Sequence, residues 1–118
     1  PHPIFPTMTV HVDGLAIDWL GYATVRIEGP ERVVYVDPGR YGVLTGEWTP
    51  DSDAAADAHP TGTEYRPEDG DTVFVTHRHH YDPDGIERVA SDDAALVAFD
   101  GINVHGTDRI DVRWLASE

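Results

Sequence analysis

The 118-residue sequence contains no lysine, no cysteine and no long hydrophobic run. The absence of cysteine excludes disulfides and thiolate metal sites, so any bound metal must be held by His, Asp or Glu side chains. No apolar run approaches the roughly 18 residues that a spanning helix needs, and the N-terminus lacks the basic-then-apolar order of a secretory signal. We therefore expect a soluble, cytoplasmic protein without a membrane partner.

The charge is strongly one-sided. Eight basic residues, all arginine, stand against 22 acidic residues, which gives a net charge of −14. The acids are spread along the chain rather than gathered in a tail, so we assign them to a folded acidic surface. Such a surface repels itself at ordinary ionic strength and is tolerated near molar salt, where the screening length falls to about 3 Å. A halophilic source is expected, with an acidic protein of a mesophile as the alternative, and nucleic acid is not expected as a partner.

The length fits one modest domain, which we place at residues 9–118, after an N-terminal extension over residues 1–8. Alternation of apolar and polar residues predicts strands over 15–20 and 23–29. A more continuously apolar strand then ends at the turn Asp37-Pro38-Gly39. These three strands should form an antiparallel meander.

A second group of elements follows a long connection that lacks any sustained period. The segment "DTVFVT" predicts a buried strand ending at Thr76. A helix should begin at Asp84, which stands three residues before Glu87 in capping-box spacing. Strands are predicted over 94–99 and 109–115, so strand, helix and strand make a βαβ unit with adjacent parallel strands.

Potential metal ligands crowd the loop between that buried strand and the helix. In extended geometry His77 and His79 point the same way, so a spacing of two lets both imidazoles reach one cation. Two donors are too few for a tight site. Asp82 is the nearest carboxylate that a turn can bring to the same place, and His80 is a further nitrogen donor. Three surface histidines without a common ligand are the alternative.

The order of strand, histidine loop, glycine and helix resembles the metallo-β-lactamase superfamily, whose signature is T-H-x-H-x-D-H followed by Gly at a helix start. Here the signature is "THRHHYD" from Thr76 to Asp82, with Gly85 in register. The segments "IDWLGYATVRIEG" and "VVYVDPG" are similar to the WLGHA and VDP segments of the branch that includes the L-ascorbate-6-phosphate lactonases. The resemblance covers roughly residues 15–99. It implies an α+β or α/β fold, the N-terminal half of an αβ/βα sandwich, mostly β with one or two helices.

Individual positions match or depart from that pattern. Asp37 matches the family's Asp that accepts hydrogen bonds behind the histidine loop. Tyr81 and Asp82 stand where the signature has Asp and His, and Tyr22 replaces the His of WLGHA. Arg40, Tyr41 and Trp48 follow Asp37 closely, so with Tyr22 they are candidates for the substrate side, and Arg40 suits a carboxylate or phosphate. A surface loop with one aromatic anchor is the alternative for them.

The resemblance implies a metal-dependent hydrolase that cleaves an ester, lactone or phosphoester of a small-molecule substrate through hydroxide on one or two Zn²⁺ or Mn²⁺ ions. His77 and His79 would hold the metal, with His80 and Asp82 as further ligands and Asp82 as the catalytic residue. The family's later half supplies more ligands, and of the downstream residues only His105 is a histidine. The expected partner is therefore a missing C-terminal half or a second copy. The alternative function is a truncated or degenerate module that binds metal or a partner without catalysis.

Overall fold

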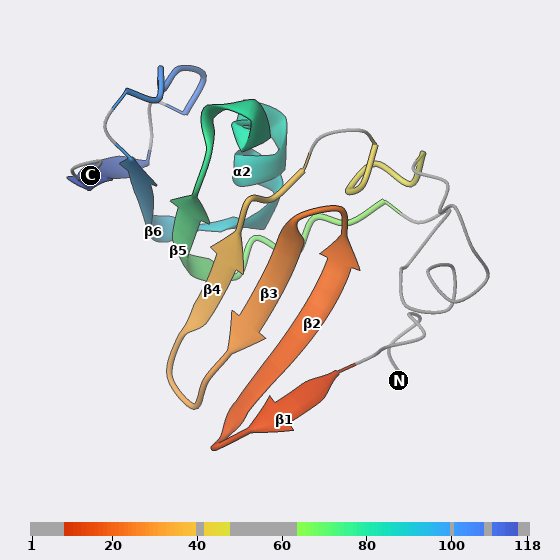
Figure 1. Ribbon diagram of the computed structural model, residues 1–118. Helices are drawn as coiled ribbons and strands as arrows, with labels where there is room; N and C mark the ends of the chain where they lie inside the picture. Colours follow the sequence, from red (N-terminus) through yellow and green to blue (C-terminus); the bar gives the residue numbers. More distant parts are fainter. Residues whose placement is uncertain (1–8, 40–41, 48–63, 100, 108–109, 116–118) are drawn as a thin grey trace.

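The computed structural model describes residues 9–39, 42–47, 64–99, 101–107 and 110–115. The described elements form one seven-stranded sheet in the order β1-β2-β3-β4-β5-β6-β7, with one helix, α2, and a single 3₁₀ turn, η1 (Figure 1). The elements are β1 (Val10–Val12), β2 (Leu15–Gly21), β3 (Thr24–Glu28), β4 (Val33–Val36), β5 (Gly70–Val75), η1 (Arg78–His80), α2 (Pro83–Val89), β6 (Ala90–Phe99) and β7 (Asp111–Leu115). No helix among the described residues is long and apolar enough to cross a membrane.

The N-terminal strands form the predicted antiparallel meander. β2 pairs with β3, and β3 pairs with β4, so that prediction is confirmed. The sequence prediction missed β1, which pairs antiparallel with β2 as an edge strand. Asp13 and Gly14 join these two strands with φ angles of 49° and 85°. An Asp-Gly pair with both residues at positive φ is typical of a tight hairpin turn that fits the right-handed strand twist.

The second half of the sheet is parallel. β5 pairs with β6 in parallel, with α2 between them in the chain, which confirms the predicted βαβ unit. β4 also pairs in parallel with β5, and β6 with β7. β6 begins at Ala90, earlier than predicted, because it follows the helix without an intervening loop. The carboxyl ends of β4, β5 and β6 therefore share one edge of the sheet.

The predicted start of the helix was wrong by a short distance. α2 begins at Pro83, and Asp82 is its N-cap, with a side chain that accepts a hydrogen bond from the backbone N–H of Asp84. Proline suits the first helical position, since its fixed φ fits the helix and its missing N–H has no helical partner there. A capping residue directly before proline outweighed the capping-box spacing of Asp84 and Glu87.

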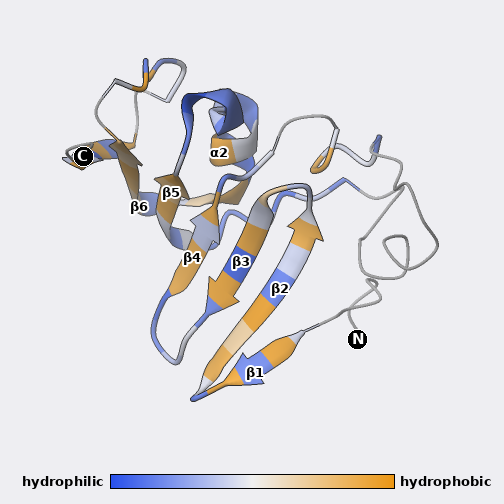
Figure 2. Ribbon diagram, viewed as in Figure 1, coloured by the Kyte–Doolittle hydropathy of each residue, from blue (hydrophilic) through white to orange (hydrophobic). Residues whose placement is uncertain are grey.

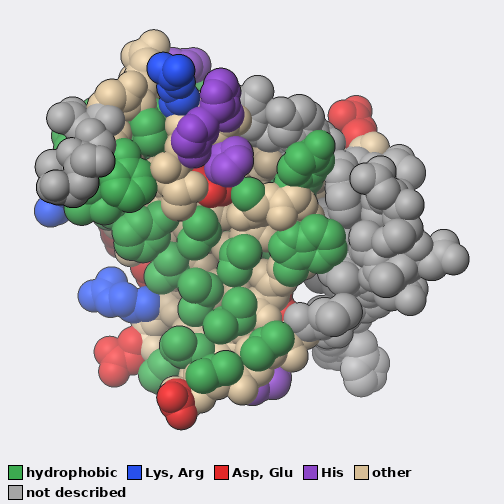
Figure 3. Space-filling model, in the orientation of Figure 1, with side chains coloured by type: hydrophobic (Ala, Val, Ile, Leu, Met, Phe, Trp, Pro, Cys, Tyr) green, Lys and Arg blue, Asp and Glu red, His purple; other side chains and the backbone are tan. Residues whose placement is uncertain are grey.

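The two faces of the sheet differ in cover. Tyr35, Val73 and Leu96 point to one face and are fully buried, and Ile86 and Val89 of α2 complete the core there. On the opposite face, the strand registers align two rows of paired residues across the sheet. Nearly all of these residues are apolar, and none of them is fully buried. These rows contain Ile17, Ile27, Val34, Thr72 and Ala95, and Trp19, Val25, Val36, Phe74 and Val97. We call them the open face; hydrophobic residues colour the strands in Figure 2 and cover the centre of the molecule in Figure 3.

A buried polar network joins the meander to the segment before β5. The Tyr35 hydroxyl donates to Asp69 at 2.8 Å, accepts from Arg26 Nε at 3.0 Å and lies 2.9 Å from the Tyr65 hydroxyl. Burial raises the pKa of Tyr35, and the neighbouring Tyr65 and Asp69 raise it further. Burial lowers the pKa of Arg26, but hydrogen bonds to Asp69 and Glu28 outweigh this effect, so the guanidinium stays charged.

Candidate metal centre

The candidate site lies at the shared carboxyl edge of the parallel strands, where open α/β sheets place their ligands. Asp37 follows β4, the histidine loop follows β5, and the segment 101–107 follows β6. Three chain segments that are distant in sequence thus meet at one edge. Figure 3 shows the histidine side chains gathered there next to an arginine.

The turn after β4 holds Asp37 in a restricted conformation. Asp37 has a φ of 49°, a left-handed value that Asp adopts more readily than most residues. The buried Thr24 hydroxyl donates to the Asp37 carbonyl at 2.8 Å and accepts from the Gly39 N–H at 3.1 Å. Thr24, at the start of β3, therefore fixes both sides of the turn and aims the Asp37 carboxylate along the sheet edge.

The Asp37 carboxylate supports the histidine loop directly. One oxygen accepts from the backbone N–H of Thr76 at 2.7 Å, and the other accepts from the Thr76 hydroxyl at 2.5 Å. The second oxygen also lies 3.0 Å from Nδ1 of His80. Asp37 is only 5% exposed, so these contacts are made away from bulk water. A His80 ring whose Nδ1 is bonded to a carboxylate presents Nε2 outward, as metal-ligating imidazoles do.

The histidine loop is a 3₁₀ turn rather than the extended segment that the sequence predicts. η1 covers Arg78–His80, and Nδ1 of His77 accepts from the backbone N–H of His79 at 3.2 Å, which caps the turn. The His77 and His79 rings still lie together, with centroids 4.7 Å apart and planes at 29°. The His77 and His80 rings are 5.7 Å apart. The turn therefore gathers all three imidazoles, although by a different route from strand alternation.

Asp82 performs a structural task in this structure. Its Oδ1 accepts from the Asp84 N–H at 3.2 Å as the helix cap. Its Oδ2 lies against Gly39, close enough that a Cβ on Gly39 would stand 2.4 Å from it. Gly85, one turn into the helix, packs on the same β4 turn, where an added Cβ would meet the Pro38 carbonyl oxygen at 2.2 Å. The helix N-terminus and the Asp37 turn are thus in direct contact.

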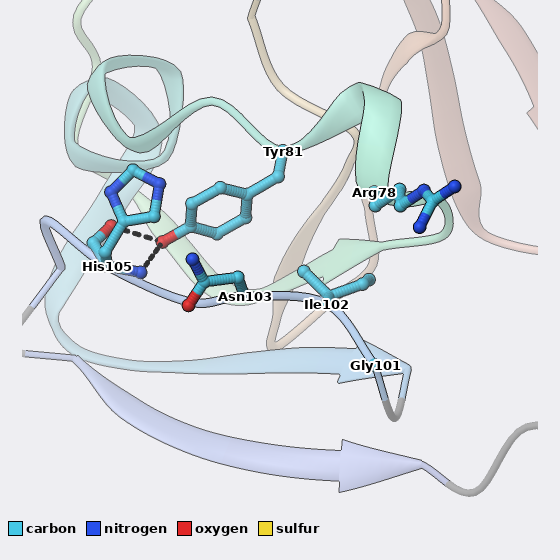
Figure 4. A pocket seen from close by; sticks show the side chains of 6 residues that line it. All are labelled: Arg78, Tyr81, Gly101, Ile102, Asn103 and His105. Atoms are coloured by element: carbon cyan, nitrogen blue, oxygen red, sulfur yellow. Dashed lines mark hydrogen bonds between the residues drawn. The ribbon is translucent and has the colours of Figure 1, made fainter.

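Tyr81, which replaces the signature aspartate, ties the histidine loop to the segment after β6. It is 9% exposed, and its hydroxyl accepts from the His105 N–H at 2.8 Å and donates to the His105 carbonyl at 2.5 Å. The rings of Tyr81 and His105 lie 5.2 Å apart at one end of a cavity (Figure 4). His105 therefore lies beside the loop through its backbone.

Of the predicted substrate-side residues, only Tyr22 is among the residues that the structure describes. Tyr22 lies on the β2–β3 turn at the same sheet edge, two residues before Thr24, with 56% of its surface exposed. Arg40, Tyr41 and Trp48 lie outside the described residues. Sequence analysis missed Thr24 and named Thr76 only as the first residue of the signature, although the hydroxyls of both bond the Asp37 turn. Their partners are 13 and 39 positions away, so no local signal indicates these contacts.

The chemistry of the donors fits a borderline-soft divalent ion, since imidazole nitrogen suits zinc. Within the described ranges, no group of three His, Asp or Glu side chains already has the spacing of a metal site. What the structure does provide is two neighbouring rings, His77 and His79, and a third, His80, whose orientation Asp37 fixes. These residues would hold the ion.

Comparison with known proteins agrees with this architecture. A family model described as the beta-lactamase superfamily domain matches residues 16–115. The chain therefore belongs to the β-lactamase superfamily, and its fold, mostly β-sheet with one helix, corresponds to half of a metallo-β-lactamase-type sandwich. Searches of curated proteins and of solved structures found no match. Family membership supports a hydrolase-like metallo-fold.

Proposed function

We propose that this chain carries the metal-binding edge of a hydrolase that cleaves an ester, lactone or phosphoester of a small molecule. The observation that carries the proposal is the Asp37–His80 contact beside the stacked His77 and His79 rings, at the carboxyl ends of parallel strands. A buried carboxylate bonded to Nδ1 of a partly exposed imidazole is the arrangement that orients metal-ligating histidines. Membership of the β-lactamase superfamily supports the same chemistry.

Each residue of the proposed site would have its own role. His77, His79 and His80 would hold Zn²⁺ or Mn²⁺, which when bound supplies a Lewis acid and lowers the pKa of water toward 7. Asp37 would keep His80 in one tautomer, because its carboxylate requires a proton on Nδ1. Tyr22, on the exposed side of the same edge, can donate a hydrogen bond to a substrate oxygen.

The test compares histidines inside and outside the site. Metal content is measured after purification in high salt, followed by hydrolysis of ester and phosphoester substrates with added Zn²⁺ or Mn²⁺. We expect His79→Ala to lose stoichiometric metal and hydrolysis, whereas His11→Ala, on the exposed edge strand β1, keeps both. A wild-type chain that neither binds metal nor hydrolyses any of these substrates would contradict the proposal.

We also propose that the open face packs against the open face of a second copy. Strand spacing of about 4.8 Å and a strand length of about 17 Å give roughly 500 Å² across β1 to β6, so two copies bury about 1,000 Å², the lower limit for a specific interface. The two rows of paired residues on β2 to β6, extended onto β1 by Val10, carry no charge, although the chain has a net charge of −14. Two such faces stack without bringing like charges together, as sheets do in sandwiches.

A substitution on the open face tests this partner. Val36→Asp, at the centre of the face, should shift the chain from dimer to monomer in sedimentation, whereas Glu28→Gln, on the opposite face of β3, should not. A wild-type chain that is monomeric from low to molar salt would overturn the pairing.

A further inference from the structure

Two adjoining cavities lie between the histidine loop and the segment that follows β6. One, of about 320 Å³, is lined by Arg78, Tyr81, Gly101, Ile102, Asn103 and His105. The other, also about 320 Å³, is lined by Thr76, His77, Arg78, Phe99, Gly101 and Ile102. Arg78 belongs to both, and Figure 4 shows it at the opposite end of the first cavity from Tyr81 and His105. Each volume lies in the range of small-molecule sites.

The described residues of this lining carry the opposite charge to the chain as a whole. The described lining residues include an arginine and two histidines and no Asp or Glu. The whole sequence has 22 acidic residues against 8 basic ones. A hollow with basic side chains in so acidic a chain concentrates an anion and repels a cation.

Arg78 differs in its contacts from four of the other five described arginines, and shares its lack of an ion pair only with Arg32. Among the six described arginines, Arg26, Arg66, Arg88 and Arg113 each form a salt bridge with an acid. The Arg78 guanidinium forms no ion pair or hydrogen bond with any described residue, and its side chain is exposed at the cavity. A guanidinium presents a planar fork of donors that matches carboxylate and phosphate oxygens in a bidentate manner.

We infer that Arg78 binds an oxyanion, the carboxylate or phosphate group of a small molecule, in the cavities beside His77. Asn103 and His105 also line the first cavity and carry further hydrogen-bond donors. The ligand group would be held next to the imidazoles that we assign to the metal. The inference adds a substrate class to the proposed hydrolase, but anion binding itself depends on neither metal nor hydrolysis.

The experiment therefore uses the metal-free protein, with inorganic phosphate and acetate as separate probes at constant ionic strength. NMR signals of the His77 and His105 rings report the site, and titration gives the dissociation constant for each probe. We expect Arg78→Gln to raise that constant at least fivefold and Arg78→Lys to raise it less, since lysine keeps the charge without the fork. Preference for phosphate over acetate, or the reverse, identifies which oxyanion the site takes.

Arg32→Gln is the matched control. Arg32 is exposed, forms no ion pair with a described residue and lies on the β3–β4 turn, at the opposite end of the sheet from the histidine loop. Its loss changes the net charge as much as the loss of Arg78 does, so it should leave both constants unchanged. Equal weakening by Arg32→Gln and Arg78→Gln would show a general charge effect and overturn the inference. Unperturbed His77 and His105 signals at saturating probe would overturn it as well.

Discussion

Replacing Gly85 by alanine would improve the helix propensity of α2 but would create a clash with the turn after β4. Gly85 is a helical residue, and alanine in an exposed helix is favoured over glycine by about 1 kcal/mol. At this position, however, the added Cβ would lie 2.2 Å from the Pro38 carbonyl oxygen and 2.8 Å from the Gly39 Cα. Non-bonded heavy atoms pack at about 3.5 Å, so the β4 turn must move by roughly 1 Å.

The expected loss of stability depends on which atoms must move to relieve the clash. Both clashing groups are backbone, and the turn is held by Thr24 and Asp37, so relief is costly; overpacking of this kind costs about 1–3 kcal/mol or more. After the helix preference is subtracted, we expect Gly85→Ala to lower the free energy of unfolding by about 2 kcal/mol, or the melting temperature by roughly 8–10 °C. The displaced turn should also weaken the Asp37–His80 contact and reduce metal affinity.

Thermal and urea unfolding measure the stability, and calorimetric titration with Zn²⁺ measures the affinity. Gly29→Ala is the control, because its Cβ would meet only the end of the Leu15 side chain at 3.3 Å and the Arg32 carbonyl at 3.7 Å. This variant should change stability by less than about 1 kcal/mol. A Gly85→Ala protein as stable as the wild type or more so would refute the contact between the helix and the turn, and with it the support that we assign to the histidine loop.

Three further predictions rest on other contacts. Asp37→Asn should lower stability by about 2 kcal/mol and metal affinity about tenfold or more, since an amide has one acceptor oxygen and cannot accept from both the Thr76 N–H and His80; unchanged calorimetry and melting would contradict this. Burial raises the pKa of Tyr35, so the stability it contributes is complete below pH 10 and is lost as the pH rises above 10; urea unfolding at pH 8 to 12 should show this slope, and a flat profile would exclude it. Screening should stabilise a chain of net charge −14, so the melting temperature should rise from 0.1 to 2 M KCl, and a fall would count against a halophilic source.

Sequence periodicity predicted the sheet well because its signals are local. Alternation of apolar and polar residues in the early strands predicted the antiparallel meander. The buried strand ending at Thr76, followed by a helix and another strand, predicted the parallel unit. β1 has only three residues, too few for periodicity, yet Asp13-Gly14 carried a usable turn signal. Two aspartates, Asp82 and Asp84, were candidates for the helix N-cap. Pro83 decides in favour of Asp82, because proline suits the first helical position.

The site was less predictable because its geometry comes from distant partners. The spacing of His77 and His79 indicated that the rings meet, but the 3₁₀ turn depends on the carboxylate of Asp37, which holds Thr76 and His80 from another strand. Likewise, the exposure of Arg78 at a cavity depends on the path of the segment after β6. Contacts that span dozens of residues leave no periodic trace in a single sequence.

Tyr81 affects the number of metal ions that the histidine loop could bind. The signature aspartate there would supply an oxygen ligand, but the Tyr81 hydroxyl is bonded to both the N–H and the carbonyl of His105 and is therefore committed to holding the segment after β6. The next carboxylate, Asp82, is committed at the helix N-cap and against Gly39. Releasing Asp82 would leave the Asp84 N–H without its cap, at a cost of about 1 kcal/mol. The loop would thus offer imidazole nitrogens first, and we expect it to bind one ion rather than two.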